Sequence, residues 1–188
     1  MPVESDAMVI SASIGDPERF GALFDRHATV LFRYLARRVS GDEADLLLGE
    51  VFRVAFERRE TYDCERPNAR PWLYGIATNL LAHHRRSEAR RLHATARLLT
   101  DRAPCADPTD QVDSAIDAAN FWPVVAHHVA QLPDLERDAL LLFVWEDLSY
   151  EEIAAALDVP VGTVRSRLNR ARLRLRELRT SSGREWRE

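Results

Sequence analysis

Residues 148–178 read LSYEEIAAALDVPVGTVRSRLNRARLRLREL and carry the clearest structural signals in the chain. Ser149 and Glu152 have the spacing of a capping box, in which the serine hydroxyl and the glutamate carboxylate each accept a backbone N–H at the start of a helix. A short helix is therefore predicted from Tyr150 to Leu157. The next three residues, 158–160, predict a tight turn, and a second helix is expected to open near residues 161–163. Two short helices joined in this way are typical of a helix-turn-helix.

The second of these helices has two different faces. Its apolar residues recur at helical spacing, at Val164, Leu168, Ala171, Leu175 and Leu178. In a helix-turn-helix the second helix enters the major groove, and side chains near its start are best placed to reach base edges. An arginine-rich helix alone is more often a solvated face, but here the capping box, the turn and the apolar stripe agree. The residues expected to contact DNA are Thr163, Arg165, Ser166, Arg167, Asn169 and Arg170.

The rest of the chain is also predicted to be helical. Apolar residues at helical spacing favour helices over residues 17–40, 42–59, 72–91 and 134–145. Pro17 suits the first helical position, Gly41 is expected to end that helix, and Asp42 is expected to cap the next one. The stretch 62–71 contains Pro67, Asn68 and Pro71 and predicts a loop.

The helical pattern fails between Thr100 and Asp117. Aspartates and prolines stand there among few large apolar residues, which predicts a mobile acidic linker. The chain is therefore expected to be all-α, with two small helical domains at residues 16–99 and 118–180. The flexible linker at residues 100–117 would join them, and the second domain would contain the helix-turn-helix.

The charge of the chain is unevenly distributed. The 188 residues carry a formal charge of -4, which argues against a protein that simply coats nucleic acid. However, eleven acidic residues and a single arginine lie between Asp110 and Asp158, whereas nine arginines and two acids lie between Val161 and Arg187. The segregation predicts a localised contact with a polyanion.

Signals for catalysis, metal binding and membrane insertion are missing from the sequence. Cys64 and Cys105 lie far apart without a CxxC spacing, and the histidines lack an HExxH arrangement. There is no phosphate-binding glycine loop and no nucleophile elbow. We therefore expect neither enzymatic activity nor a cofactor or metal. No apolar run approaches the length of a membrane helix, so a cytoplasmic protein is expected.

Two long stretches resemble the extracytoplasmic-function (ECF) sigma factors of the sigma-70 family. Residues 132–178 resemble conserved region 4, above all in residues 145–154 (WEDLSYEEIA) and 159–168 (VPVGTVRSRL). Residues 20–91 resemble region 2, above all in residues 70–80 (RPWLYGIATNL) and at Glu50-Val51-Phe52. The resemblance implies a sigma factor that directs RNA polymerase to promoters and reads their minus-10 and minus-35 elements while bound to the core enzyme.

The resemblance also implies a role for particular residues. The helix-turn-helix would read the minus-35 element. Core polymerase, promoter DNA and an anti-sigma factor would be the partners. The helix that docks on the clamp coiled coil of polymerase would use Leu47, Glu50, Val51 and Phe52. A second set of residues would read the minus-10 element, capture a base flipped from the melted strand and hold the DNA backbone. These residues are Tyr62, Arg70, Trp72, Asn79, Arg85 and Arg86.

Some of these positions depart from the family pattern or suit an ordinary structural role. Leu46 stands where the family usually has an acidic residue, and Gly49 stands where it has glutamine, so the detailed polymerase contacts are open. Trp72 lies at helical spacing from Ile76, a pattern that is more often found in a core than in a ligand site. Asn79 is the more suggestive residue, because a mid-helix asparagine is unfavourable without a partner.

The alternative to a sigma factor is an autonomous regulator that binds an operator. Its N-terminal domain would sense a ligand or dimerise, and its helix-turn-helix would bind duplex DNA without polymerase. The resemblance of residues 20–91 to region 2 favours the sigma factor. Association discriminates between the two, since the regulator should be a dimer and the sigma factor a monomer bound to core polymerase.

The first prediction concerns the linker, which by the resemblance threads a basic channel of polymerase in an extended form. Shortening the segment from Pro104 to Asp113 should impair run-off transcription with purified core enzyme, while circular dichroism shows that both domains remain folded. Initiation at the rate of the full-length chain after this deletion would refute the threading role.

Overall fold

The computed structural model describes residues 4–99 and 127–182, and every regular element in these ranges is a helix. The prediction of an all-α chain is confirmed. The expected linker at residues 100–117 and the expected start of the second domain at residue 118 lie outside the described residues. Within the described ranges, no helix is both long and apolar enough to cross a membrane.

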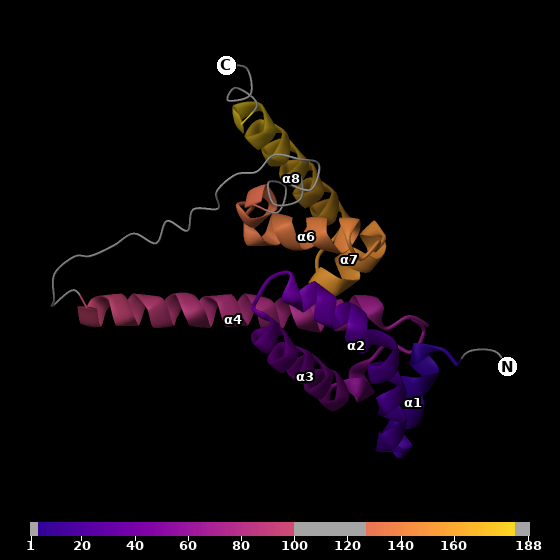
Figure 1. The fold of residues 1–188 in the computed structure, drawn as a ribbon. Helices are drawn as coiled ribbons and strands as arrows, with labels where there is room; N and C mark the ends of the chain where they lie inside the picture. The colour runs from indigo at the N-terminus through magenta and orange to yellow at the C-terminus, as the bar shows by residue number, and fades with distance from the viewer. Residues whose placement is uncertain (1–3, 100–126, 183–188) are drawn as a thin grey trace, which may run out of the picture.

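The N-terminal domain packs three long helices around a shared core. Tyr34, Leu35, Val51, Ala55, Leu73 and Tyr74 are among its fully buried residues. A short helix at the N-terminus lies at one end of the bundle (Figure 1), where it contacts two 3-10 turns. The elements are α1 (Asp6–Gly15), η1 (Pro17–Phe20), α2 (Gly21–Ala36), α3 (Gly41–Glu57), η2 (Arg59–Thr61) and α4 (Arg70–Leu99).

Three details of this domain differ from the sequence predictions. The helix α1 was not predicted, and Pro17 opens the 3-10 turn η1 rather than an α-helix. The cap of α3 is Ser40 rather than Asp42. The Ser40 hydroxyl accepts the Glu43 N–H at 3.4 Å, and the Glu43 carboxylate accepts the Ser40 N–H at 3.0 Å. Since this capping box satisfies two otherwise unpaired backbone donors, Gly41 falls in the first turn of α3 instead of ending α2.

The C-terminal domain contains α6 (Asp134–Val144), α7 (Tyr150–Leu157) and α8 (Val161–Ser182). The predicted capping box at Ser149 is confirmed, with distances of 3.2 Å and 2.9 Å for its two hydrogen bonds. Asp158 adopts a left-handed conformation with φ of 50° and ends α7, which produces the turn before α8. The predicted apolar stripe on α8 is buried at Val164, Leu168 and Ala171 and partly buried at Leu175, while the Leu178 side chain lies outside the described residues. The helix-turn-helix is therefore present.

The two domains lie directly against each other, with α7 packed on α4 (Figure 1). Gly75 makes this approach possible. A Cβ atom at Gly75 would lie 2.5 Å from the backbone oxygen of Ala156 in α7, closer than a carbon atom tolerates. Since the obstructing atom belongs to the backbone, no rotation of a side chain relieves the clash, and this glycine sets how closely the domains pack.

Replacing Gly75 by alanine should separate the domains without unfolding them. Alanine is the better helix former by about 1 kcal/mol, so α4 itself is not weakened, while the added methyl group displaces α7. We expect a larger radius of gyration in small-angle X-ray scattering and an unchanged far-ultraviolet circular dichroism spectrum. The control is Gly49→Ala, because a Cβ atom there meets nothing within 4 Å. If Gly75→Ala scatters like the unaltered chain, the observed packing is not the state in solution.

Candidate nucleic-acid interface

The start of α8 presents its polar side chains to solvent. Arg165, Ser166, Asn169 and Arg170 are exposed, and Thr163 and Arg167 are half-buried. The buried stripe on the opposite face holds the helix against the domain, so these six predicted residues share the outer surface. Arg170 also lies 3.6 Å from the Glu136 carboxylate of α6, and Arg174 lies 3.0 Å from it. The domain itself therefore partly neutralises the later arginines, whereas Arg165 and Arg167 lie before that ion-pair cluster.

The loop between η2 and α4 brings two predicted aromatic residues together. The rings of Tyr62 and Trp72 lie 5.0 Å apart between centroids, and the Tyr62 hydroxyl donates to the Arg66 carbonyl oxygen at 2.6 Å. They line a cavity of about 160 Å³ with polar side chains that include Asp63 and Asn68. Ala155 of α7 forms part of the same wall, so the C-terminal domain partly covers this cavity.

Asp6 fixes the position of this loop, a role that the sequence did not reveal. Its carboxylate accepts hydrogen bonds from the Ala69 N–H at 3.0 Å, from His27 Nε2 at 2.8 Å and from Arg26 at 3.0 Å. The Asp6 N–H also donates to the Pro67 carbonyl oxygen at 3.1 Å. Burial alone would raise the pKa of Asp6, but the hydrogen bonds from His27, Ala69 and Arg26 lower it to about 2. Asp6 therefore stays ionised and ties α1 and α2 to the loop.

The other predicted minus-10 residues divide into exposed and paired side chains. Asn79 and Arg86 are exposed. In contrast, Arg70 donates to the backbone oxygen of Glu146 at 3.1 Å, and Arg85 lies 3.2 Å from Asp134 and 3.7 Å from Asp138. These partners all belong to the C-terminal domain. Two predicted DNA contacts are therefore already occupied by acidic or carbonyl oxygens.

The predicted polymerase-binding residues on α3 are not equally accessible. Leu47 and Glu50 are half-buried, and Glu50 pairs with Arg53. Val51 is fully buried and Phe52 is 7% exposed, which makes both of them core residues of the domain rather than surface contacts. The exposed apolar surface beside them comes instead from Leu46, which is 77% exposed, and from Phe24, whose ring lies 4.8 Å from that of Phe52.

Comparison with known proteins identifies the family. Residues 23–91 match the family described as sigma-70 region 2, and residues 126–175 match sigma-70 region 4. The ECF RNA polymerase sigma factor SigL of Mycobacterium tuberculosis is 34% identical over 179 residues, which cover 92% of this chain and 97% of SigL. The chain belongs to the ECF RNA polymerase sigma factors.

Other relatives and solved structures agree with this assignment. The ECF RNA polymerase sigma-E factor of Haemophilus influenzae is 30% identical over 172 residues, covering 88% of this chain and 90% of the relative. The fold is similar to that of CnrH, with a TM-score of 0.65 and 23% identity over 94% of this chain and 97% of CnrH. It is also similar to that of the sigma factor RpoE from Bartonella quintana, with a TM-score of 0.62 and 22% identity over 85% of this chain and 95% of RpoE. The protein thus acts in promoter-specific transcription initiation, and the autonomous regulator is not favoured.

Within this ECF sigma factor, Arg165 and Arg167 generate a prediction about specificity. Replacing either by alanine should reduce discrimination between a matched and a mutated minus-35 element by about 1 to 3 kcal/mol if it makes a bidentate contact to guanine. The measurement is promoter binding by the holoenzyme. Arg172→Ala serves as the control, because the Arg172 guanidinium lies over the Phe143 ring of its own domain, 5.6 Å from the centroid. An equal loss of binding affinity on the matched and the mutated promoter would show that Arg165 and Arg167 contact phosphates and not bases.

Proposed function

We propose that this sigma factor reads the minus-35 element with the first turns of α8 and the minus-10 element with the loop at 62–69 and the adjoining face of α4. The support for the first role is that Arg165, Ser166, Asn169 and Arg170 are exposed, with Thr163 and Arg167 half-buried beside them. The support for the second is the cavity lined by Tyr62 and Trp72, with exposed Asn79 and Arg86 further along α4.

Docking on core polymerase would use the exposed edge of α3. Leu47 and Glu50 are accessible there, and Val51 and Phe52 would hold the helix in place from the inside. Leu46 and Phe24 add apolar surface beside them. The two functional units would be residues 16–99 and 118–180 with the linker at 100–117. The protein would work in the cytoplasm with polymerase and would have no catalytic activity of its own.

We call the observed packing of the two domains the closed arrangement. In it, the C-terminal domain would mask the residues proposed to read the minus-10 element, here called the minus-10 surface. Arg85 pairs with the carboxylates of Asp134 and Asp138 as it would with DNA phosphates, and Arg70 donates to the Glu146 backbone oxygen. The Tyr74 hydroxyl also donates to the Glu146 carboxylate, and burial together with this hydrogen bond raises the pKa of Tyr74. The engagement of Arg70 and Arg85 by oxygens of the C-terminal domain is the observation that carries the proposal, because these donors cannot bind DNA phosphates at the same time.

Core polymerase would activate the factor by holding the domains apart at promoter spacing. Each separated domain offers few phosphate contacts, and affinity built on few contacts is weak and falls with salt. Two weak contacts held at the correct distance bind as one bivalent unit without any new base contact. An anti-sigma factor would act on the same equilibrium. The similar RpoE structure contains the anti-sigma factor NepR, which supports such a partner here.

This proposal predicts that the free chain binds promoter duplex poorly and becomes selective on core polymerase. Binding would be measured at about physiological salt with and without core enzyme, on a matched promoter and on one whose spacer is lengthened by several base pairs. We expect tight binding only when core enzyme is present and the promoter has the matched spacer. The Gly75→Ala variant should bind DNA more tightly than the unaltered chain when both are free, because its minus-10 surface is uncovered.

Two results would contradict the proposal. Tight, sequence-selective binding by the free chain would favour an autonomous regulator. Indifference to spacer length in the presence of polymerase would remove the bivalent reading of the promoter.

A further inference from the structure

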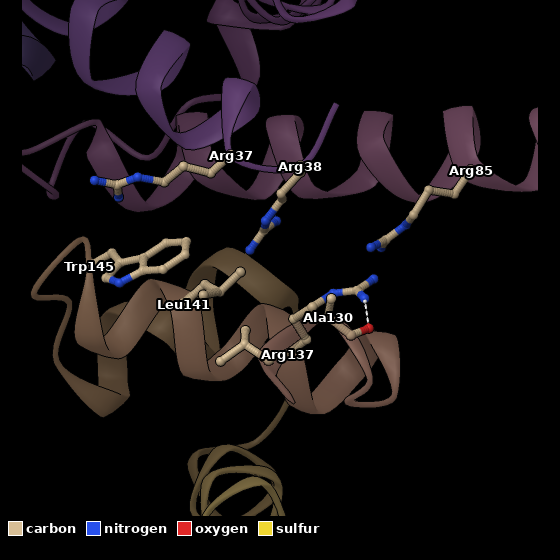
Figure 2. Close-up of a pocket in the computed structure, with 8 residues that line it drawn as sticks. Arg37, Arg38, Arg85, Ala130, Arg137, Leu141 and Trp145 are labelled. Atoms are coloured by element: carbon tan, nitrogen blue, oxygen red, sulfur yellow. Dashed lines mark hydrogen bonds between the residues drawn. The ribbon is translucent and has the colours of Figure 1, made fainter. Parts of the chain in front are cut away.

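A cavity of about 240 Å³ lies between the two domains. Figure 2 shows Arg38 and Arg85 reaching from the N-terminal domain toward α6, Arg37 lying across the Trp145 ring, and Arg137 on α6 facing them. The apolar side chains of Val129, Leu141 and Trp145 line the rest of the wall. Among the described residues that line this cavity, four are arginines and none carries a carboxylate.

The acids around the cavity do not balance these arginines. Asp138 lies 3.3 Å from Arg38 and 3.7 Å from Arg85, and Asp134 pairs with both Arg85 and Arg137. Glu146 lies 3.8 Å from Arg37 and is shared with Arg70 at 3.9 Å. Among the described residues, five arginines therefore share three carboxylates, which leaves an excess of two positive charges around the cavity.

Several arginine donors around the cavity have no hydrogen-bond partner among the described residues. They are Nε and Nη2 of Arg38 and Nε and Nη2 of Arg85, and all four atoms are buried. Nη2 of Arg85 still lies 3.7 Å from Asp138 Oδ2, and Oδ1 of Asp138 is a buried acceptor without a hydrogen bond at the same site. The Arg38 side chain is only 5% exposed. An unpartnered buried donor of a charged group is unfavourable, so these atoms favour a further acceptor.

The arginines also disturb one another. Burial lowers the pKa of Arg137, and the neighbouring charges of Arg85 and Arg38 lower it further, against the opposing effect of Asp134 and Asp138. An anion between them would remove this repulsion.

We propose that this cavity binds a phosphate group, as inorganic phosphate or diphosphate, and that binding holds the two domains together. A phosphate group offers several strong acceptor oxygens and, as inorganic phosphate at pH 7, between one and two negative charges, which suits both the donors without hydrogen bonds and the excess of positive charge. Planar guanidinium groups bind such oxygens in pairs. A volume of about 240 Å³ lies below the range of about 300 to 1,000 Å³ that is usual for drug-sized ligands, which favours a small anion.

The site exists in the closed arrangement because its arginines come from both domains. A ligand that binds the closed state and not the open state shifts the equilibrium toward the closed state. Phosphate would thus stabilise the form in which Arg70 and Arg85 are paired with the C-terminal domain. This inference depends on the closed packing and not on which residues read the promoter.

The test is isothermal titration of the full-length chain with phosphate and with diphosphate, in a chloride buffer held at constant ionic strength. We expect saturable binding and a higher melting temperature with either anion. Arg38→Gln and Arg137→Gln should each weaken binding about tenfold or more, the usual loss for a charge-assisted hydrogen bond. Arg33→Gln is the matched control. Arg33 carries the same charge, lies in α2 one turn before Arg37, is exposed and does not line the cavity.

The variants also define the results that would overturn the inference. The cavity is not an anion site if the unaltered chain gives no saturable heat. The same conclusion follows if the Arg38→Gln and Arg137→Gln variants bind the anions as strongly as the Arg33→Gln control. Circular dichroism checks that each variant is folded, and small-angle X-ray scattering checks that its two domains stay packed together. Arg85→Gln replaces either one that is not, since Arg85 is less buried, with a side chain that is 24% exposed. Promoter binding plays no part in this measurement, so it can fail while the proposed promoter contacts stand.

Discussion

The buried ion pair between Arg38 and Asp138 is the constraint around which the two domains are arranged. The two charges come from different domains, and each side chain is only 5% exposed. Burial raises the pKa of Asp138 even though Arg38 and Arg85 lie beside it, so the carboxylate loses more by leaving water than its partners return. Removing one member of such a pair typically costs about 3 to 5 kcal/mol, because the other stays buried and uncompensated.

An interface built in this way contains many groups that water can satisfy when the domains separate. The contacts around the central pair are also polar. Tyr74 and Arg70 bind Glu146 on one side, and Arg85 binds Asp134 on the other. Charged and hydrogen-bonding groups are rehydrated when domains separate, whereas an apolar interface of the same area would oppose separation. Polar packing at the interface therefore suits a protein whose domains must act both together and apart.

The sequence predicted those parts of the structure whose determinants lie close together in the chain. The capping box at Ser149, the turn and the buried stripe from Val164 onward fall within about thirty residues, and each was found where predicted. At α3, both Ser40 and Asp42 are residues that can cap a helix. Ser40 is the cap because the Glu43 carboxylate completes a capping box with it. The pairing of Arg85 with Asp138 joins segments far apart in sequence, so no local pattern could indicate it.

The acidic block between Asp110 and Asp158 gains a structural reason from this packing. Asp134 and Asp138 lie four residues apart, on one face of α6, and both reach arginines of the N-terminal domain. Resemblance to the family assigned Arg85 to DNA, and the structure adds that carboxylates of the same chain occupy it in the closed form. A DNA-binding protein with a formal charge of -4 is therefore not a contradiction. The acids that lower the net charge include those that cover the basic surface.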